Sequence, residues 1–198
     1  IDLDWFFDNL LNENKKIDYG VKKKNGEFYL VNKGFVDAPM PIAFMQNGKP
    51  TITWQTAPIG GEMQLVKPIG PIESILVDPE KITNDVFPNN DASKNKIKLK
   101  LGTGRDKKGI NEIYWLPAYA WNVYDKSMLG LVLHNYAISN KAFQYHIVPL
   151  YSFENKSING LADINYTFTG EGLAQNTQLG VKAISFSFEE RNFGRAEY

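Results

Sequence analysis

The chain has 198 residues with 22 basic and 22 acidic side chains, so it lacks the overall positive field on which general nucleic-acid binders depend. Because it contains no cysteine and only two histidines, disulfide frameworks, thiol nucleophiles and cysteine-type zinc sites are excluded. A hydrophobic content of 43%, with 12 Phe, 10 Tyr and 4 Trp, predicts a folded chain with a real core.

The first segment predicts one short amphipathic helix within residues 1–16, with Asp2 or Asp4 as its N-cap. Its apolar residues recur four positions apart: Phe6 with Leu10, and Phe7 with Leu11. The three consecutive aromatic residues, Trp5, Phe6 and Phe7, need an apolar surface to pack against, either on the domain that follows or on a domain upstream. The start at Ile1, without an initiator Met, indicates a piece cut from a longer protein.

Short apolar runs then predict a small antiparallel β-sandwich over residues 17–92. The predicted strands are Glu27–Val31, Met40–Phe44, Thr51–Trp54 and Ile72–Val77. Asn47-Gly48 is the clearest hairpin signal, because both residues tolerate the positive φ of a type I′ turn. The polar stretch at residues 89–91 is typical of a boundary.

Residues 94–108 carry seven basic side chains against one acid, Asp106. A basic stretch of this kind binds nucleic acid or anionic lipid headgroups in some proteins. Residues 96–101, however, alternate strictly between Lys and Ile or Leu, which is typical of one strand with a solvated face. We favour the strand, in which the lysines would prevent the edge of a sheet from pairing with another chain.

Residues 93–198 are expected to form a sheet of long antiparallel strands, barrel-like or a second sheet. Five runs are about twice the usual strand length: Ile113–Tyr124, Met128–Ile138, Phe143–Phe153, Ile158–Phe168 and Gln178–Phe188. Such lengths, with aromatic residues at the run ends, are typical of outer-membrane barrels. Five strands cannot close a barrel, and Tyr114-Trp115-Leu116 is apolar on both faces. A partial barrel and a soluble meander therefore both remain open.

No catalytic or metal-binding motif occurs in the sequence. His134 and His146 lie twelve residues apart on predicted strands, without the spacing that a zinc-peptidase helix requires, and are expected to be hydrogen-bonded packing residues. Neither a nucleophile elbow nor a phosphate loop is present, and the glycine-rich residues 101–109 precede no predicted helix. On its residues alone the chain is a non-catalytic β-rich accessory region.

The order of motifs in residues 1–92 resembles the C-terminal part of gluzincin-type zinc aminopeptidases, the membrane alanyl aminopeptidase family, in its Bacteroidetes-type members. In that family an Asp-Trp-Phe-Phe helix and a loop ending in Asp-Tyr precede a β-sandwich. The matching stretches are Asp2–Asp8, Ile17–Tyr19, Val31–Gly34, Pro39–Ile42, Asn47–Lys49, and Val77–Glu80 followed by Asp85 and Asn89-Asn90. Residues 113–138 are similar, more weakly, to the first hairpin of a surface-antigen type outer-membrane barrel.

The resemblance implies a non-catalytic accessory or scaffold region of a zinc metallopeptidase. The family's zinc ligands and catalytic Tyr have no counterparts here, so the chain itself would hold no cofactor and the parent would hold zinc. Its partners would be the upstream catalytic domain, and peptide substrate or the outer membrane, but not nucleic acid. The implied location is the cell envelope, periplasmic or outer-membrane associated.

An alternative is a cell-surface β-sandwich module that binds a glycan or a protein. The residues expected to carry that role are exposed tryptophans, which stack on sugar rings or on a partner: Trp54, Trp115 and Trp121.

Overall fold

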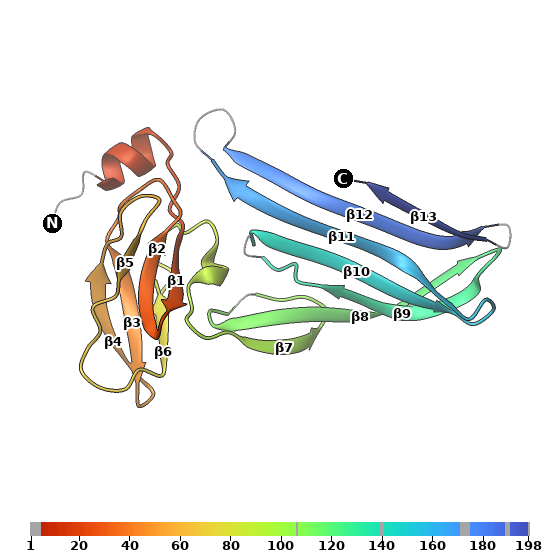
Figure 1. Ribbon diagram of the computed structural model, residues 1–198, viewed down its shortest axis with the longest axis horizontal. Coiled ribbons are helices and arrows are strands. Elements are labelled where there is room, and N and C mark those ends of the chain that lie inside the picture. Colours follow the sequence, from red (N-terminus) through yellow and green to blue (C-terminus); the bar gives the residue numbers. More distant parts are fainter. Residues whose placement is uncertain (1–4, 106, 139–140, 171–174, 189–190, 198) are drawn as a thin grey trace. The chain divides into compact units, whose positions relative to one another are not determined.

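A computed structural model describes residues 5–105, 107–138, 141–170, 175–188 and 191–197 (Figure 1). The protein is mostly β, with one short N-terminal helix, as the sequence predicts. It divides into two compact units. The first comprises residues 1–96, 106–111 and 169–175, and the second comprises residues 97–105, 112–168 and 176–198.

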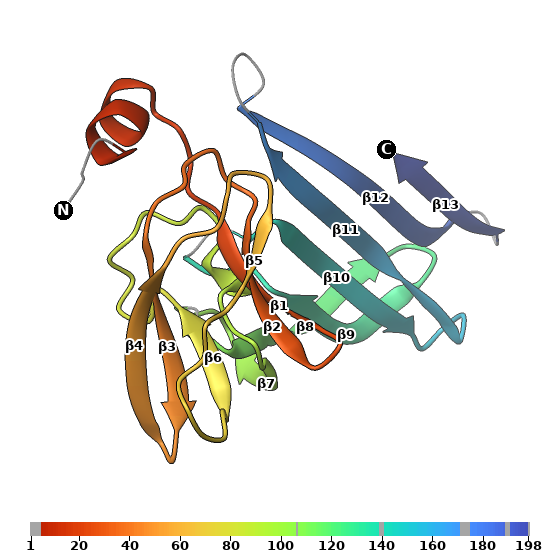
Figure 2. The same cartoon turned by 60° about the vertical axis from the view of Figure 1, so that its left-hand side comes forward.

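The first unit contains two three-stranded antiparallel sheets that form a sandwich-like fold (Figure 2). One sheet has the order β1 (Tyr19–Lys24), β2 (Glu27–Asn32), β5 (Glu62–Gln64), and the other has the order β4 (Lys49–Gln55), β3 (Met40–Gln46), β6 (Ser74–Val77). Asn47 and Gly48 have φ angles of 49° and 73°, which confirms the predicted tight turn between β3 and β4.

The core of the first unit surrounds the buried Tyr19. Its hydroxyl group donates a hydrogen bond to the Ala38 carbonyl (3.0 Å) and accepts one from the Asn32 amide (3.1 Å). Apolar side chains of both sheets, including Leu30 and Phe44, complete this core. Burial raises the pKa of Tyr19. The hydroxyl therefore stays protonated and ties β1 to the chain that crosses between the sheets.

The N-terminal helix η1 (Trp5–Asn12) has π-helical hydrogen bonding. Trp5 and Leu10 pack against the core of the first unit, which places the helix on the domain that follows it. Phe7 and Leu11 remain 52% and 61% exposed, so half of the apolar stripe has no cover within the described residues. The expected caps, Asp2 and Asp4, lie outside those residues.

The second unit is a seven-stranded sheet with the order β13 to β7. The five long runs are confirmed as β8 (Ile110–Asn122), β9 (Lys126–His134), β10 (Phe143–Ser152), β11 (Ser157–Thr169) and β12 (Asn176–Phe188). Antiparallel registers join β8 to β9, β9 to β10, and β10 to β11. The sheet is open, with β7 (Lys96–Leu101) and β13 (Arg191–Glu197) as its edges.

Two features differ from the predicted antiparallel meander. Strand β13 was not predicted, because its seven residues include Gly194 and three charges and show no apolar run. Strand β7 exists as predicted but runs parallel to β8: the Lys96 N–H donates to Gly109 and the Gly102 N–H donates to Trp115. The loop of residues 102–109 returns the chain to the start of β7 before β8 begins. Between β6 and β7 lies a short 3-10 helix, η2 (Pro88–Asn90).

Candidate functional site

The long sheet has two chemically different faces. The registers place Trp115 opposite Leu133, Leu133 opposite Ile147, and Ile147 opposite Ala162. Successive side chains of a strand point to opposite faces. One face therefore collects the odd-numbered residues of β8, β9 and β10 with the even-numbered residues of β11; we call it the apolar face. The opposite side is the polar face.

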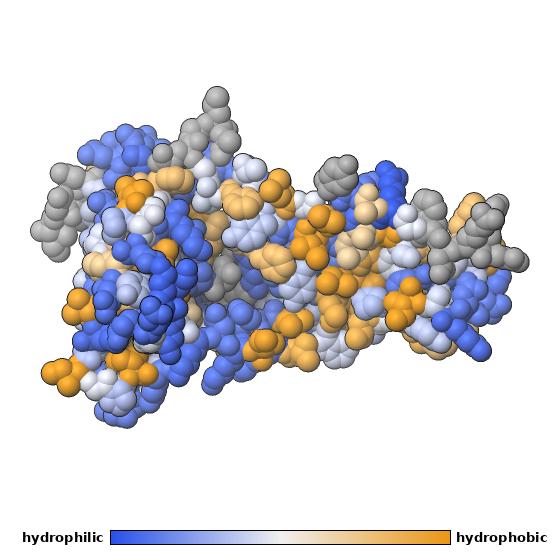
Figure 3. Space-filling model, viewed as in Figure 1, coloured by the Kyte–Doolittle hydropathy of each residue, from blue (hydrophilic) through white to orange (hydrophobic). Residues whose placement is uncertain are grey.

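The apolar face carries no charged side chain on β8 to β11. Apart from Asn111 and Ser127, its residues there are aliphatic, aromatic, Pro or Gly. Many are more than a third exposed: Tyr119, Trp121, Leu129, Leu131, Phe143, Tyr151, Ile158, Ile164, Tyr166 and Phe168. On the polar face of these strands, only Leu116 is a large apolar residue with comparable exposure. Figure 3 shows hydrophobic residues gathered over the long strands.

Aromatic side chains concentrate at both ends of the apolar face. At one end, Phe143 lies directly opposite Tyr166, whose ring is 4.6 Å from that of Phe168. At the other end are Tyr119 and Trp121 on β8 with Tyr151 on β10. Between Phe143 and Tyr151 the strand rises about 27 Å. Aliphatic residues such as Leu131 and Ile164 fill the space between these two aromatic belts.

The polar face carries the charges of the same strands. A row of directly opposed residues crosses it: Tyr114, His134, His146 and Asp163. Tyr114 stacks on His134 at 5.4 Å, and the two histidine rings lie 6.5 Å apart. The backbone N–H of Tyr136 donates to His134 Nδ1, so this histidine is a hydrogen-bonded packing residue, as predicted. A small core around Met128, Val148 and Leu150 occupies the rest of this face.

A buried carboxylate, Asp125, links the hairpin tips at one end of the sheet. It accepts hydrogen bonds from the amides of Asn122 (2.9 Å), Asn155 (3.0 Å) and Asn159 (2.8 Å), and from the Ser187 N–H (2.9 Å). Burial acts to raise the pKa of Asp125, but these hydrogen bonds outweigh it and hold the pKa well below its usual range. The tips of β8–β9 and β10–β11 therefore form one hydrogen-bonded unit with the end of β12.

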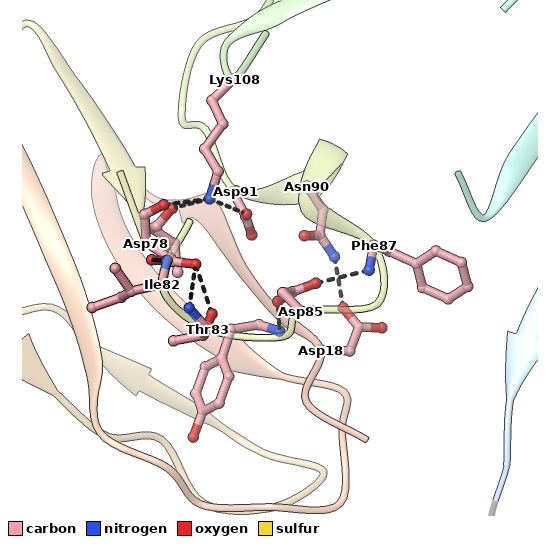
Figure 4. A network of polar contacts seen from close by, with 11 residues as sticks. Asp18, Asp78, Ile82, Thr83, Asp85, Phe87, Asn90, Asp91 and Lys108 are labelled. Atoms are coloured by element: carbon pink, nitrogen blue, oxygen red, sulfur yellow. Dashed lines mark hydrogen bonds and ion pairs between the residues drawn. The ribbon is translucent and has the colours of Figure 1, made fainter. Parts of the chain in front are cut away.

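The first unit contains a second buried polar cluster, drawn in Figure 4. Lys108 Nζ donates to Asp91 (2.7 Å) and to the carbonyls of Val77 (2.8 Å) and Asp78 (2.6 Å). Burial raises the pKa of Asp91 to about 8 and that of Asp85 to about 7. The carboxylates of Asp78 and Asp85 accept hydrogen bonds from backbone N–H groups. Asp78 accepts from residues 82 and 83, and Asp85 accepts from residues 19 and 87. We assign this cluster to holding the loop of residues 78–91.

The three tryptophans expected to bind a partner are not brought together. Trp54, on β4 of the first unit, and Trp121 are 60% and 59% exposed, as that prediction requires. Trp115 is half-buried, which corrects its expected exposure; it lies within the apolar face, directly opposite Leu133 on the neighbouring strand. Trp115 and Trp121 do share the apolar face, which is larger than the three-tryptophan site that the sequence suggested.

Sequence reasoning missed that surface as a whole. The run Tyr114-Trp115-Leu116 suggested broken alternation, although Tyr114 lies on the polar face and hydrogen-bonds to the buried Glu112. The signal that finds the surface is the small number of charges: β8, β9 and β11 carry one each, Glu112, Lys126 and Asp163, and β10 carries none. Once the strands are in register, all three charges fall on the polar face.

Within the described residues, no three or more His, Asp or Glu side chains are placed to hold a metal ion. Over the same residues, no helix has the length and apolar character needed to cross a membrane. Comparisons with models of known families, with curated proteins and with solved structures found no match to this chain.

Proposed function

We propose that this chain is a non-catalytic anchoring and scaffold region, whose long sheet enters a lipid bilayer with its apolar face against the acyl chains and its edge strands β7 and β13 paired with further strands, because hydrocarbon leaves no sheet edge unpaired. The observation that carries the proposal is an exposed, uncharged face between two aromatic belts. Soluble monomers rarely expose apolar patches beyond a few hundred Å², because each exposed Å² costs about 25 cal/mol.

A lipid environment accounts for the pattern better than a protein partner does. Strands of membrane barrels alternate apolar and polar residues, and aromatic girdles flank an apolar band about 25 Å tall. The spacing of the two belts on β10 is comparable to that height. Protein interfaces have a polar rim around an apolar centre instead. The proposal places the chain in the cell envelope, with the outer membrane as a partner.

We further propose that the parent protein is a zinc metallopeptidase of the aminopeptidase type. The order of motifs in residues 1–92 supports this assignment. The uncovered side of η1, with Phe6, Phe7 and Leu11, fits docking against a preceding catalytic domain. In that arrangement the sandwich-like unit serves as a spacer and scaffold, and the parent's zinc is held upstream of this chain.

Membrane insertion is tested with two neighbouring substitutions on opposite faces. Ile164→Lys, on the apolar face, is expected to lower the stability of the chain folded in phosphatidylcholine vesicles by about 2–4 kcal/mol, because a charge would face the acyl chains. Asn165→Lys, on the polar face, replaces the amide that donates to Asp163 with a cation beside the same carboxylate, and is expected to change the stability by less than about 1 kcal/mol. The measurement is urea unfolding in vesicles, followed by tryptophan fluorescence.

A soluble sheet gives the opposite result. Its apolar face would then contact water, so Ile164→Lys would be neutral and would improve solubility. Wild-type chain that stays monomeric without detergent and does not associate with vesicles contradicts the proposal. If its fluorescence also shifts on addition of glycans, the alternative surface module with Trp54 and Trp121 takes its place.

The metallopeptidase assignment has its own test. The isolated chain is expected to bind no stoichiometric zinc and to hydrolyse no aminoacyl substrate, since the family's ligands have no counterparts in its sequence. Metal analysis and an aminopeptidase assay on rigorously purified chain check this. Zinc at one equivalent, or activity that copurifies with the chain, contradicts the accessory role.

A further inference from the structure

The basic stretch of residues 94–108 is only partly neutralised within the fold. Lys108 binds Asp91, and Lys100 binds the buried Glu112 at 2.6 Å. Lys96, Lys98 and Arg105 stay exposed. Neither Lys96 nor Lys98 has an ion pair with any residue that the structure describes. Strand β7 therefore presents free positive charge along an edge of the long sheet.

The same strand also continues the apolar face. Lys100 reaches Glu112, which lies on the polar face of β8, so the even-numbered residues of β7 share that face. The odd-numbered ones, Ile97, Leu99 and Leu101, then lie on the side of the apolar face, and they are 71%, 69% and 65% exposed. Apolar and cationic side chains thus alternate at one sheet edge.

We propose that β7 binds the negatively charged headgroups of an anionic lipid surface. This inference rests on the proposed membrane role of the apolar face. Lysines beside apolar residues suit the boundary between headgroups and acyl chains, where each group finds its own environment. A nucleic acid offers phosphates but no apolar layer, so it would leave Ile97, Leu99 and Leu101 in water.

The test compares vesicles of phosphatidylcholine with vesicles that also contain phosphatidylglycerol. Wild-type chain is expected to prefer the anionic vesicles at low salt, and the double variant Lys96→Gln/Lys98→Gln is expected to reduce that preference about 25-fold, at about fivefold per lysine. The matched control, Lys22→Gln/Lys49→Gln, removes two exposed charges from β1 and β4 and is expected to keep the preference. The readout is the ratio of the two partition coefficients.

The outcomes separate this inference from the proposed function. If the chain inserts into phosphatidylcholine but the ratio is the same in the variant and the wild type, headgroup binding by β7 is wrong and the membrane role stands. If the chain fails to insert but still binds anionic vesicles through Lys96 and Lys98, the membrane-spanning role is wrong and the headgroup site stands. Equally tight, lysine-dependent binding to a DNA duplex overturns the lipid assignment in favour of nucleic acid.

Discussion

At pH 9, where Asp91 is ionised in the wild type, replacing Lys108 with methionine is expected to lower the free energy of unfolding of the first unit by about 3–5 kcal/mol. The side chain of Lys108 is 7% exposed and that of Asp91 is fully buried. Methionine keeps the apolar stem, but it leaves Asp91 without its cation and removes the hydrogen bonds that Lys108 donates to the carbonyls of Val77 and Asp78. Removing one partner of a buried pair costs more than the pair itself contributes.

The pH dependence of this loss has a definite sign. Burial and the neighbouring carboxylate of Asp85 raise the pKa of Asp91 and Lys108 lowers it, with a net result of about 8. Between about pH 4 and pH 8, Asp91 holds a proton in the folded state that it has released in the unfolded state. Asp91 therefore lowers the stability of the fold as pH rises through 8. Without Lys108 the pKa of Asp91 is higher still. The cost of Lys108→Met is therefore expected to be larger at pH 9 than at pH 6.

The measurement is hydrogen exchange of peptides from β3 and β6, which reports the first unit alone. Lys107→Met is the matched control, because Lys107 is the exposed neighbour of Lys108. Asp91→Asn in the wild-type background is expected to remove the loss of stability between pH 7 and pH 9. Equal exchange in the two lysine variants at both pH values contradicts the assigned role of Lys108.

The elements that follow from local sequence were predicted well. The Asn47-Gly48 turn needs only the positive φ that both residues accept, and the five long strands follow from long runs rich in apolar and aromatic residues, most of them separated by short polar connections. Strand β13 carried no such signal. The parallel course of β7 depends on where the loop of residues 102–109 returns, which no pattern within β7 encodes.

The buried polar clusters could not be predicted from the sequence either. Asp91 appeared to be part of a solvated boundary, yet it is 1% exposed because Lys108, seventeen positions away, reaches it. Asp125 follows a predicted long strand and no local pattern marks it as buried, because its partners come from as far as Ser187. Such sites are set by contacts between distant segments, whereas apolar periodicity acts within one element. The two-faced character of the long sheet lies between these cases. The alternation of residues within each strand is visible in the sequence, but the registers between strands decide that the apolar sides of all four strands fall on one face.

Asp125→Asn is expected to destabilise the second unit by about 4 kcal/mol, through loss of charge-assisted hydrogen bonds and a clash between amide donors. The folded-state pKa of Asp125 lies below that of the unfolded chain, so its stabilising effect is present above about pH 4 and is lost as pH falls below that value. The variant should therefore lose stability at pH 7 and show a weaker further loss between pH 4 and pH 2.

Asp163→Asn is the control. Asp163 pairs with the exposed Lys182 at 3.4 Å, and a pair of this kind contributes less than about 1 kcal/mol. It also accepts a hydrogen bond from the side-chain amide of Asn165 at 2.6 Å. Urea unfolding of the chain in detergent micelles, followed by fluorescence, compares the two variants at pH 7 and pH 3. The four donors to Asp125 come from the ends of β8, β11 and β12 and from the β10–β11 turn, so its loss should free several tips at once. Destabilisation no greater than that of Asp163→Asn would mean that these hairpin tips are held by their backbone pairing alone.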